Sequence, residues 1–160
     1  MLPSVKLTPP AAEAILVGAR ASEDGNETGG IVLGHDTGSE LLVTLAGDPG
    51  ANAVRTPRRF MRDLAHAQAL ADAAYDDDES VWIGEWHTHP RGPAEPSPLD
   101  RQTYQSHLAD PSLGFNRFLT LIVLPCHDHG WEHVVLAAWV VTANRIEATT
   151  VTIIEDVTDG

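Results

Sequence analysis

Two histidines and an aspartate are spaced in this chain as ligands of a metal ion. His87 and His89 follow the apolar segment SVWIGEW with one residue between them, and Asp100 comes after ten more residues. Side chains at positions i and i+2 of a strand point to the same face, so the two imidazoles should converge just beyond the strand. The intervening loop PRGPAEPSPL is rich in proline. We expect a stiff loop that folds back and brings Asp100 to the same point.

This set of side chains favours zinc over other metals. Two imidazoles and one carboxylate are typical of catalytic zinc sites, which leave a fourth position for water. Magnesium and calcium prefer mostly oxygen ligands, whereas non-haem iron also uses two histidines and a carboxylate. We predict one catalytic zinc ion at His87, His89 and Asp100, with iron as the alternative.

A second group of donors, Cys126, His127 and His129, lies in the segment PCHDHG. The segment separates two strongly apolar strand patterns, so we interpret it as a polar hairpin turn rather than a second metal site. Cys126 is the single cysteine, which excludes an internal disulfide. The sequence also lacks the motifs of nucleophile-elbow hydrolases, P-loop enzymes and zinc deaminases.

The charge of the chain argues against nucleic acid as a partner. Ten Lys and Arg residues stand against 23 Asp and Glu residues, and the resulting net charge of −13 repels a phosphate backbone. The first residues, MLPSVKLTPP, lack a basic segment followed by an apolar run. The longest apolar run, residues 134–141, is far shorter than the roughly 20 residues of a membrane helix. We expect a soluble, cytoplasmic protein that does not bind membranes.

The length and patterns of the chain predict a single α/β domain over residues 1–160, with a mixed central sheet flanked by helices. The near-continuous apolar character of residues 117–125 and 131–142 indicates a sheet covered on both faces. Residues 49–59 have no regular pattern. Strand patterns occupy residues 4–7, 29–34, 39–47, 80–86, 117–125, 131–142 and 145–155, and helical patterns occupy residues 8–22, 60–75 and a segment that begins near Pro98.

The chain resembles the JAMM metalloproteases, also called the JAB or MPN domain family, over residues 5–154. The signature of that family is a glutamate before a Gly-rich strand, then His-x-His, ten residues and an aspartate, with a serine three residues before the aspartate. The chain is most similar to small bacterial members encoded beside ubiquitin-like conjugation enzymes, including those of CBASS-type antiphage operons. The matching positions are Glu27 in ETGGIVLG, His87 and His89 in WHTHP, and Ser97 and Asp100 in SPLD.

The resemblance assigns roles to two further residues. It implies that Glu27 is the general acid/base that delivers a proton to the leaving amine. Without the resemblance, Glu27 is equally well a loop carboxylate. Ser97 is expected to hydrogen-bond the oxyanion, or to cap a helix that begins at Pro98, and the two roles are compatible. We interpret Trp86 as a core residue.

The resemblance also implies a fold and a function. The fold would be of the JAB/MPN type, with layering like that of cytidine deaminases. The activity would be a zinc-dependent isopeptidase that cuts after the C-terminal glycine of a ubiquitin-like protein, in precursor maturation or in deconjugation from lysines. The partners would be that C-terminal tail and the E1-like and E2-like enzymes of the same operon. Two alternatives stay open: a JAMM hydrolase of sulfur-carrier or small-peptide metabolism, and a non-catalytic MPN scaffold.

Overall fold

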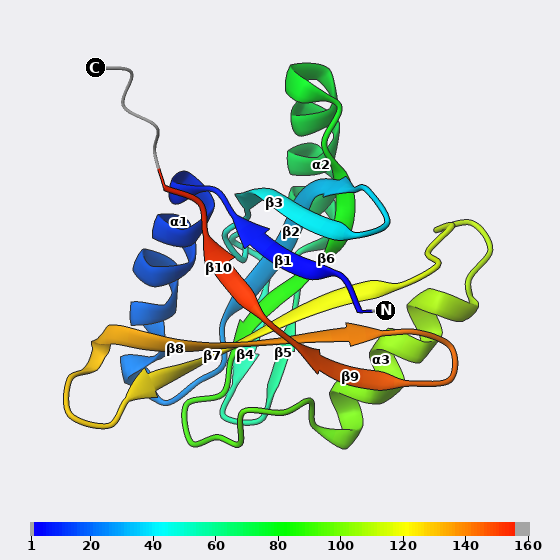
Figure 1. The fold of residues 1–160 in the computed structure, drawn as a ribbon. Helices are drawn as coiled ribbons and strands as arrows, with labels where there is room; N and C mark the ends of the chain where they lie inside the picture. Colours follow the sequence, from blue (N-terminus) through cyan, green and yellow to red (C-terminus); the bar gives the residue numbers. More distant parts are fainter. Residues whose placement is uncertain (1, 156–160) are drawn as a thin grey trace, which may run out of the picture.

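One mixed sheet of eight strands organises the chain and carries helices on both faces (Figure 1). A computed structural model describes residues 2–155. The order of the strands across the sheet is β10-β1-β3-β2-β6-β7-β8-β9. These strands are β1 (Ser4–Leu7), β2 (Gly29–Asp36), β3 (Glu40–Ala46), β6 (Val81–Thr88), β7 (Phe118–Cys126), β8 (Gly130–Val141), β9 (Ile146–Thr149) and β10 (Val151–Ile153).

The helices divide between the two faces. α1 (Pro9–Ala19), followed by the short 3-10 helix η1 (Arg20–Asp24), covers one face, and α2 (Leu64–Asp78) and α3 (Pro98–Ala109) cover the other (Figure 1). Val32 packs with Ile15 of α1, whereas its neighbour Ile31 packs with Ala74 of α2, because successive side chains of a strand face opposite ways. Trp82 packs with the clusters under both α2 and α3. The prediction of an α/β fold with a mixed central sheet flanked by helices is confirmed.

The connection between β6 and β7 determines where the carboxyl end of β6 meets α3. β6 is antiparallel to β2 but parallel to β7. Parallel neighbours need a crossover connection, and here α3 provides it. One loop, residues 89–97, therefore joins the end of β6 to the start of α3 at one edge of the sheet.

The structure corrects the prediction for residues 49–75. Residues 49–59 were expected to be irregular, but β4 (Val54–Thr56) and β5 (Arg59–Met61) form a separate hairpin there. The helix predicted from Phe60 begins only at Leu64, because Phe60 lies in β5. Asp63 fixes the start of the helix by accepting a hydrogen bond from His66 N at 3.1 Å.

The prediction of one strand over residues 145–155 is also wrong. β9 pairs with β8, whereas β10 pairs in parallel with β1 at the opposite edge of the sheet. The chain changes partner at Thr150, whose carbonyl accepts a hydrogen bond from Val5 N at 3.0 Å. The second strand thus covers the otherwise open edge of β1, which a single strand beside β8 would have left unpaired.

Burial differs between the two strands that were expected to be covered on both faces. β7 is buried from Phe118 to Val123, whereas Val135 of β8 is 51% exposed. β8 lies one strand from the edge of the sheet, where helices leave part of a face open to solvent. Among residues 2–155, no helix combines the length and apolar composition needed to cross a bilayer.

Candidate metal centre

Three donor atoms converge where β6 ends and α3 begins. His87 Nε2 and His89 Nε2 lie 2.9 Å apart, and Asp100 Oδ2 lies 3.2 Å from the first and 3.1 Å from the second. Both histidines are buried. The structure therefore brings the three side chains together as the spacing predicts, through i and i+2 positions at a strand end and a loop that folds back.

The chemistry of these atoms fits a cation. His89 Nδ1 lies 2.7 Å from the carbonyl oxygen of Pro93, which can only accept, so Nδ1 carries a proton and the Nε2 of a neutral ring carries a lone pair. That lone pair faces a carboxylate oxygen, an arrangement that requires a proton or a metal ion between them. Ligands of tetrahedral zinc at about 2.0–2.1 Å lie about 3.3 Å from one another, close to the separations found here.

Groups behind the two rings hold them in place. Pro93 orients His89 from the loop, as carbonyl groups often do for histidine ligands. Among the described residues, His87 Nδ1 makes no well-formed hydrogen bond, but it lies 3.4 Å from Glu85 Oε1. Glu85 in turn accepts a hydrogen bond from Arg62 at 3.0 Å, and the Arg62 guanidinium lies 4.8 Å from the centre of the Trp82 ring.

Asp100 is fixed by the start of its own helix. Ser97 Oγ accepts from Asp100 N at 3.0 Å, and Ser97 N donates to Asp100 Oδ2 at 2.8 Å, which is a capping box. The predicted N-cap role of Ser97 is therefore confirmed. The same carboxylate oxygen faces both histidines, so the cap that starts α3 also aims the carboxylate at them.

Glu27 lies beside the two histidines although it is 60 residues away in sequence from His87. It is buried, and one of its oxygens and the ring nitrogens of His87 and His89 lie within 4.8 Å of one another. β2 brings it there, because Gly29 pairs with His87. The β4–β5 hairpin holds the backbone of Glu27 through two hydrogen bonds. Glu27 N donates to Thr56 O at 2.8 Å, and Arg55 Nε donates to Glu27 O at 3.0 Å.

Burial and charge shift the pKa values of the cluster in opposite directions. Burial raises the pKa of the Glu27 carboxyl, although the nearby histidines oppose this shift. Burial alone would lower the pKa of His87, but Asp100 and Glu85 raise it to about 10. Hydrogen bonds to the histidines outweigh burial at Asp100 and hold the pKa of its carboxyl well below the usual range. The centre thus carries excess negative charge that a proton, or equally a divalent cation, neutralises.

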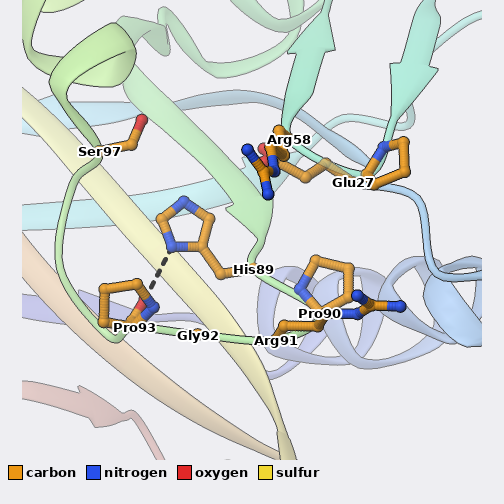
Figure 2. Close-up of a pocket in the computed structure, with 9 residues that line it drawn as sticks. Glu27, Arg58, His89, Pro90, Arg91, Gly92, Pro93 and Ser97 are labelled. Atoms are coloured by element: carbon orange, nitrogen blue, oxygen red, sulfur yellow. Dashed lines mark hydrogen bonds between the residues drawn. The ribbon is translucent and has the colours of Figure 1, made fainter.

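Two cavities meet at these donors. A cavity of about 340 Å³ is lined by Glu27, His89 and Ser97, together with Arg58, Arg91 and the prolines of the neighbouring loops (Figure 2). A larger groove of about 620 Å³ runs between β5, the start of α2 and α3 and reaches Asp100 and Glu85. The two cavities share no lining residue, so the donor cluster lies between them.

The apolar lining of the larger groove comes partly from exposed side chains. Met61, Leu64, Leu99 and Leu113 line it, and each of them is exposed to solvent. Phe60 and Trp82 complete the apolar wall. Polar and charged side chains, among them Arg59, Arg62 and Asp110, line the rest of the groove, and a solvent-open channel of this mixed composition suits an extended peptide segment.

The sequence did not point to several residues that support the centre. The position of Glu85 two residues before His87 on the same strand is a signal that could have identified it as a partner of that ring. Arg55 and Arg62 had no such signal, because only the fold brings them to Glu27 and Glu85.

The remaining candidates occupy structural positions. Trp86 is 1% exposed and donates to Gly47 O at 2.8 Å, so its interpretation as a core residue is confirmed. Residues 127–129 form the turn between β7 and β8, as predicted. Within residues 2–155, Cys126, His127 and His129 are not among the donors that lie close enough together to share an ion.

The chain is similar in sequence to proteins named as isopeptidases and as a metalloprotease. A CD-NTase/cGAS isopeptidase of Vibrio cholerae serotype O1 is 30% identical over 84 residues, which are 51% of this chain and 54% of that protein. A related isopeptidase of Escherichia coli is 31% identical over 80 residues, so the chain matches about half the length of both proteins. The probable metalloprotease y4qB of Sinorhizobium fredii is 31% identical over 138 residues, 79% of this chain and 82% of that protein.

The fold and the family follow from two further matches. The solution structure of protein DSY2949 from Desulfitobacterium hafniense has a TM-score of 0.70 at 21% identity and covers 96% of this chain and 95% of that one. Residues 9–151 match the family described as prokaryotic homologs of the JAB domain. That match covers most of the chain, and the chain belongs to this family.

Proposed function

We propose that this protein is a zinc-dependent isopeptidase that cleaves after the C-terminal glycine of a ubiquitin-like protein, in precursor maturation and in release from lysines. The observation that carries the proposal is the convergence of His87, His89 and Asp100 with the buried Glu27 beside them. The family and the relatives named isopeptidase and metalloprotease support it.

The residues of the centre would have different roles in hydrolysis. His87, His89 and Asp100 would hold the zinc ion, which lowers the pKa of its bound water and polarises the scissile carbonyl. Glu27 lies close enough to take the proton of the attacking water and to deliver it to the leaving amine. Ser97 accepts a hydrogen bond from Asp100 N, which leaves its own hydroxyl proton free to donate to the oxyanion in the smaller cavity.

The two cavities suggest how the substrate lies. The groove that ends at Asp100 would hold the extended tail, and the cavity that contains Glu27 would hold the leaving-group side, since Glu27 protonates the amine. Such a channel needs little side-chain bulk near the cut, and glycine meets this need because it lacks a Cβ. The folded body of the ubiquitin-like protein would supply binding energy away from the reacting atoms.

We further propose a cytoplasmic role in a CBASS-type antiphage system, with E1-like and E2-like enzymes of the same operon as partners. The relatives named CD-NTase/cGAS isopeptidases support this context. The conjugates to be cleaved would then include those of a CD-NTase. A genomic neighbourhood without these genes would favour the alternative of sulfur-carrier or small-peptide metabolism.

The first prediction concerns metal content. Metal analysis of the purified protein should give about one zinc per chain, and His87→Ala should lose nearly all of it, because two donors remain. His129→Ala, on the exposed β7–β8 turn, is the control and should keep the ion. Glu85→Gln should keep zinc but weaken its affinity by about 10–100-fold, as loss of a group behind a ligand does. Full zinc content in His87→Ala would place the metal elsewhere.

The second prediction separates metal binding from chemistry. Glu27→Gln keeps the shape of the side chain but cannot exchange the proton, so turnover should fall by roughly 100-fold or more while zinc is retained. Glu23→Gln, an exposed carboxylate of η1, makes the same charge change and should have no such effect. Near-normal turnover in Glu27→Gln would exclude it as the acid/base and make Glu85 the next residue to test.

The third prediction separates the two roles of Ser97. Ser97→Ala removes the cap and the oxyanion donor, so kcat should fall by about 100-fold. Loss of a cap costs about 1 kcal/mol, which lowers Tm by roughly 2–4 °C in a chain of this size. Asp63→Ala removes the cap of α2 and should lower Tm similarly with kcat preserved. Equal kcat in the two variants would leave Ser97 with the cap role alone.

The fourth prediction concerns the residue at the cut. A ubiquitin-like substrate fused to a reporter should be cleaved immediately after its final glycine, as mass spectrometry of the products would show, and a zinc chelator should block the reaction. Replacing that glycine with leucine should abolish cleavage, because its side chain would prevent close approach to the metal. Equal cleavage of the leucine substrate, or of an unfolded glycine-ended peptide, would make a general peptidase the better description.

A further inference from the structure

Two arginines line the smaller cavity without a carboxylate partner. Arg58 comes from the turn between β4 and β5, and Arg91 comes from the loop that follows β6. Both are exposed to solvent, and among residues 2–155 neither forms an ion pair within 4.0 Å. The cavity therefore presents two guanidinium groups that are free to bind an anion.

The net charge of the chain bears on which ligands this cavity can hold. Acidic residues outnumber basic ones by 23 to 10, so partners for an exposed arginine are abundant. Arg55 and Arg117 each bind an aspartate through their guanidinium groups, whereas no acidic side chain of the described residues pairs with Arg58 or Arg91. The net charge also repels acidic ligands over long distances, so an acidic group would need local cations to be held.

The two arginines lie on a defined side of the centre. Figure 2 shows Glu27, Arg58 and Arg91 on one side of His89, with Ser97 on the other. The Arg58 side chain extends from the hairpin turn toward His89 (Figure 2). Because Glu27 protonates the leaving amine, the arginines face the part of the substrate that carries this amine.

We propose that the cavity of Arg58 and Arg91 is an anion subsite that selects substrates with a carboxylate on the leaving-group side, next to the acceptor amine. The anion subsite rests on the proposed function. It adds to that function by naming the chemistry of the target protein to which the ubiquitin-like tail is attached. A guanidinium presents parallel N–H donors that match a carboxylate, and a partly enclosed cavity lowers the competition from water. Two arginine–carboxylate pairs at an exposed site should make kcat/KM for an acidic target about 10-fold higher than for a neutral one.

Three synthetic conjugates test the subsite. In each, a fluorescent tail peptide that ends in Gly-Gly is joined to the lysine Nε of an acceptor pentapeptide, whose other residues are all Gln, all Glu or all Lys. With the zinc-loaded protein, kcat/KM should be about 10-fold higher for the Glu conjugate than for the Gln conjugate. The ratio should fall to about 1 in the Arg58→Gln/Arg91→Gln double variant. In Arg58→Glu/Arg91→Glu, the Lys conjugate should become the best substrate.

Comparing conjugates on the same enzyme removes any general effect of the substitutions on Glu27 or on metal binding. Arg145→Gln is the matched control, because Arg145 is 76% exposed, lies on the β8–β9 turn and lines neither cavity. This variant removes one positive charge elsewhere and should keep the wild-type preference. A Glu-to-Gln ratio that stays the same in the double variant would overturn the proposal.

A binding measurement distinguishes failure of the subsite from failure of the proposed function. Cleavage of the Gln conjugate by the wild type but not by Glu27→Gln supports isopeptidase chemistry independently of the arginines. If the wild type cuts neither these conjugates nor the folded ubiquitin-like substrate of the fourth prediction, the proposed function is wrong. Fluorescence anisotropy of the three conjugates with Glu27→Gln then still decides the subsite: tighter binding of the Glu conjugate supports it, and equal binding overturns it.

Discussion

The pairing of β2 with β6 is the constraint on which the centre depends. Gly29 lies opposite His87, and a Cβ at Gly29 would approach the Trp86 carbonyl oxygen to 2.2 Å, so only glycine allows this contact. Thr88 N donates a hydrogen bond to Thr28 O at 2.8 Å, which extends the pairing of the two strands one residue beyond Gly29 and His87. The strand that presents the histidines is thereby tied to the segment that presents Glu27. A slip of one residue would turn the histidines to the opposite face of the sheet.

The centre concentrates buried charge, and neighbouring side chains compensate the charge of Glu85. Glu85 and Arg62 form an ion pair in which both side chains are 12% exposed, and Glu85 also approaches His87. Removing one member of a buried ion pair lowers the stability of the fold by far more than the intact pair contributes to it, because a buried charge is left unpaired. The centre is therefore rigid, because none of the side chains of Arg62, Glu85 and His87 can move without leaving another charge unpaired.

The sequence predicted the local features well and the long-range ones poorly. The strand end, the i and i+2 histidines and the cap at Ser97 depend on a few neighbouring residues, and all are found in the structure. The convergence of the side chains is likewise present, while their roles as ligands and catalysts remain predictions. The β4–β5 hairpin and the separation of β9 from β10 were missed, because they depend on which distant strand each segment meets. Arg55 and Arg62 were missed for the same reason.

The position of the two unpaired arginines has a consequence for how such a protein diversifies. Arg58 is on a hairpin turn and Arg91 on a loop, whereas the ladder and the capping box that hold the centre use other residues. Exposed turns accept substitution with little cost in stability. Under the proposed function, point mutations at these two tips in duplicated copies of the gene would change the preferred target, while the residues that hold the donor cluster stay the same.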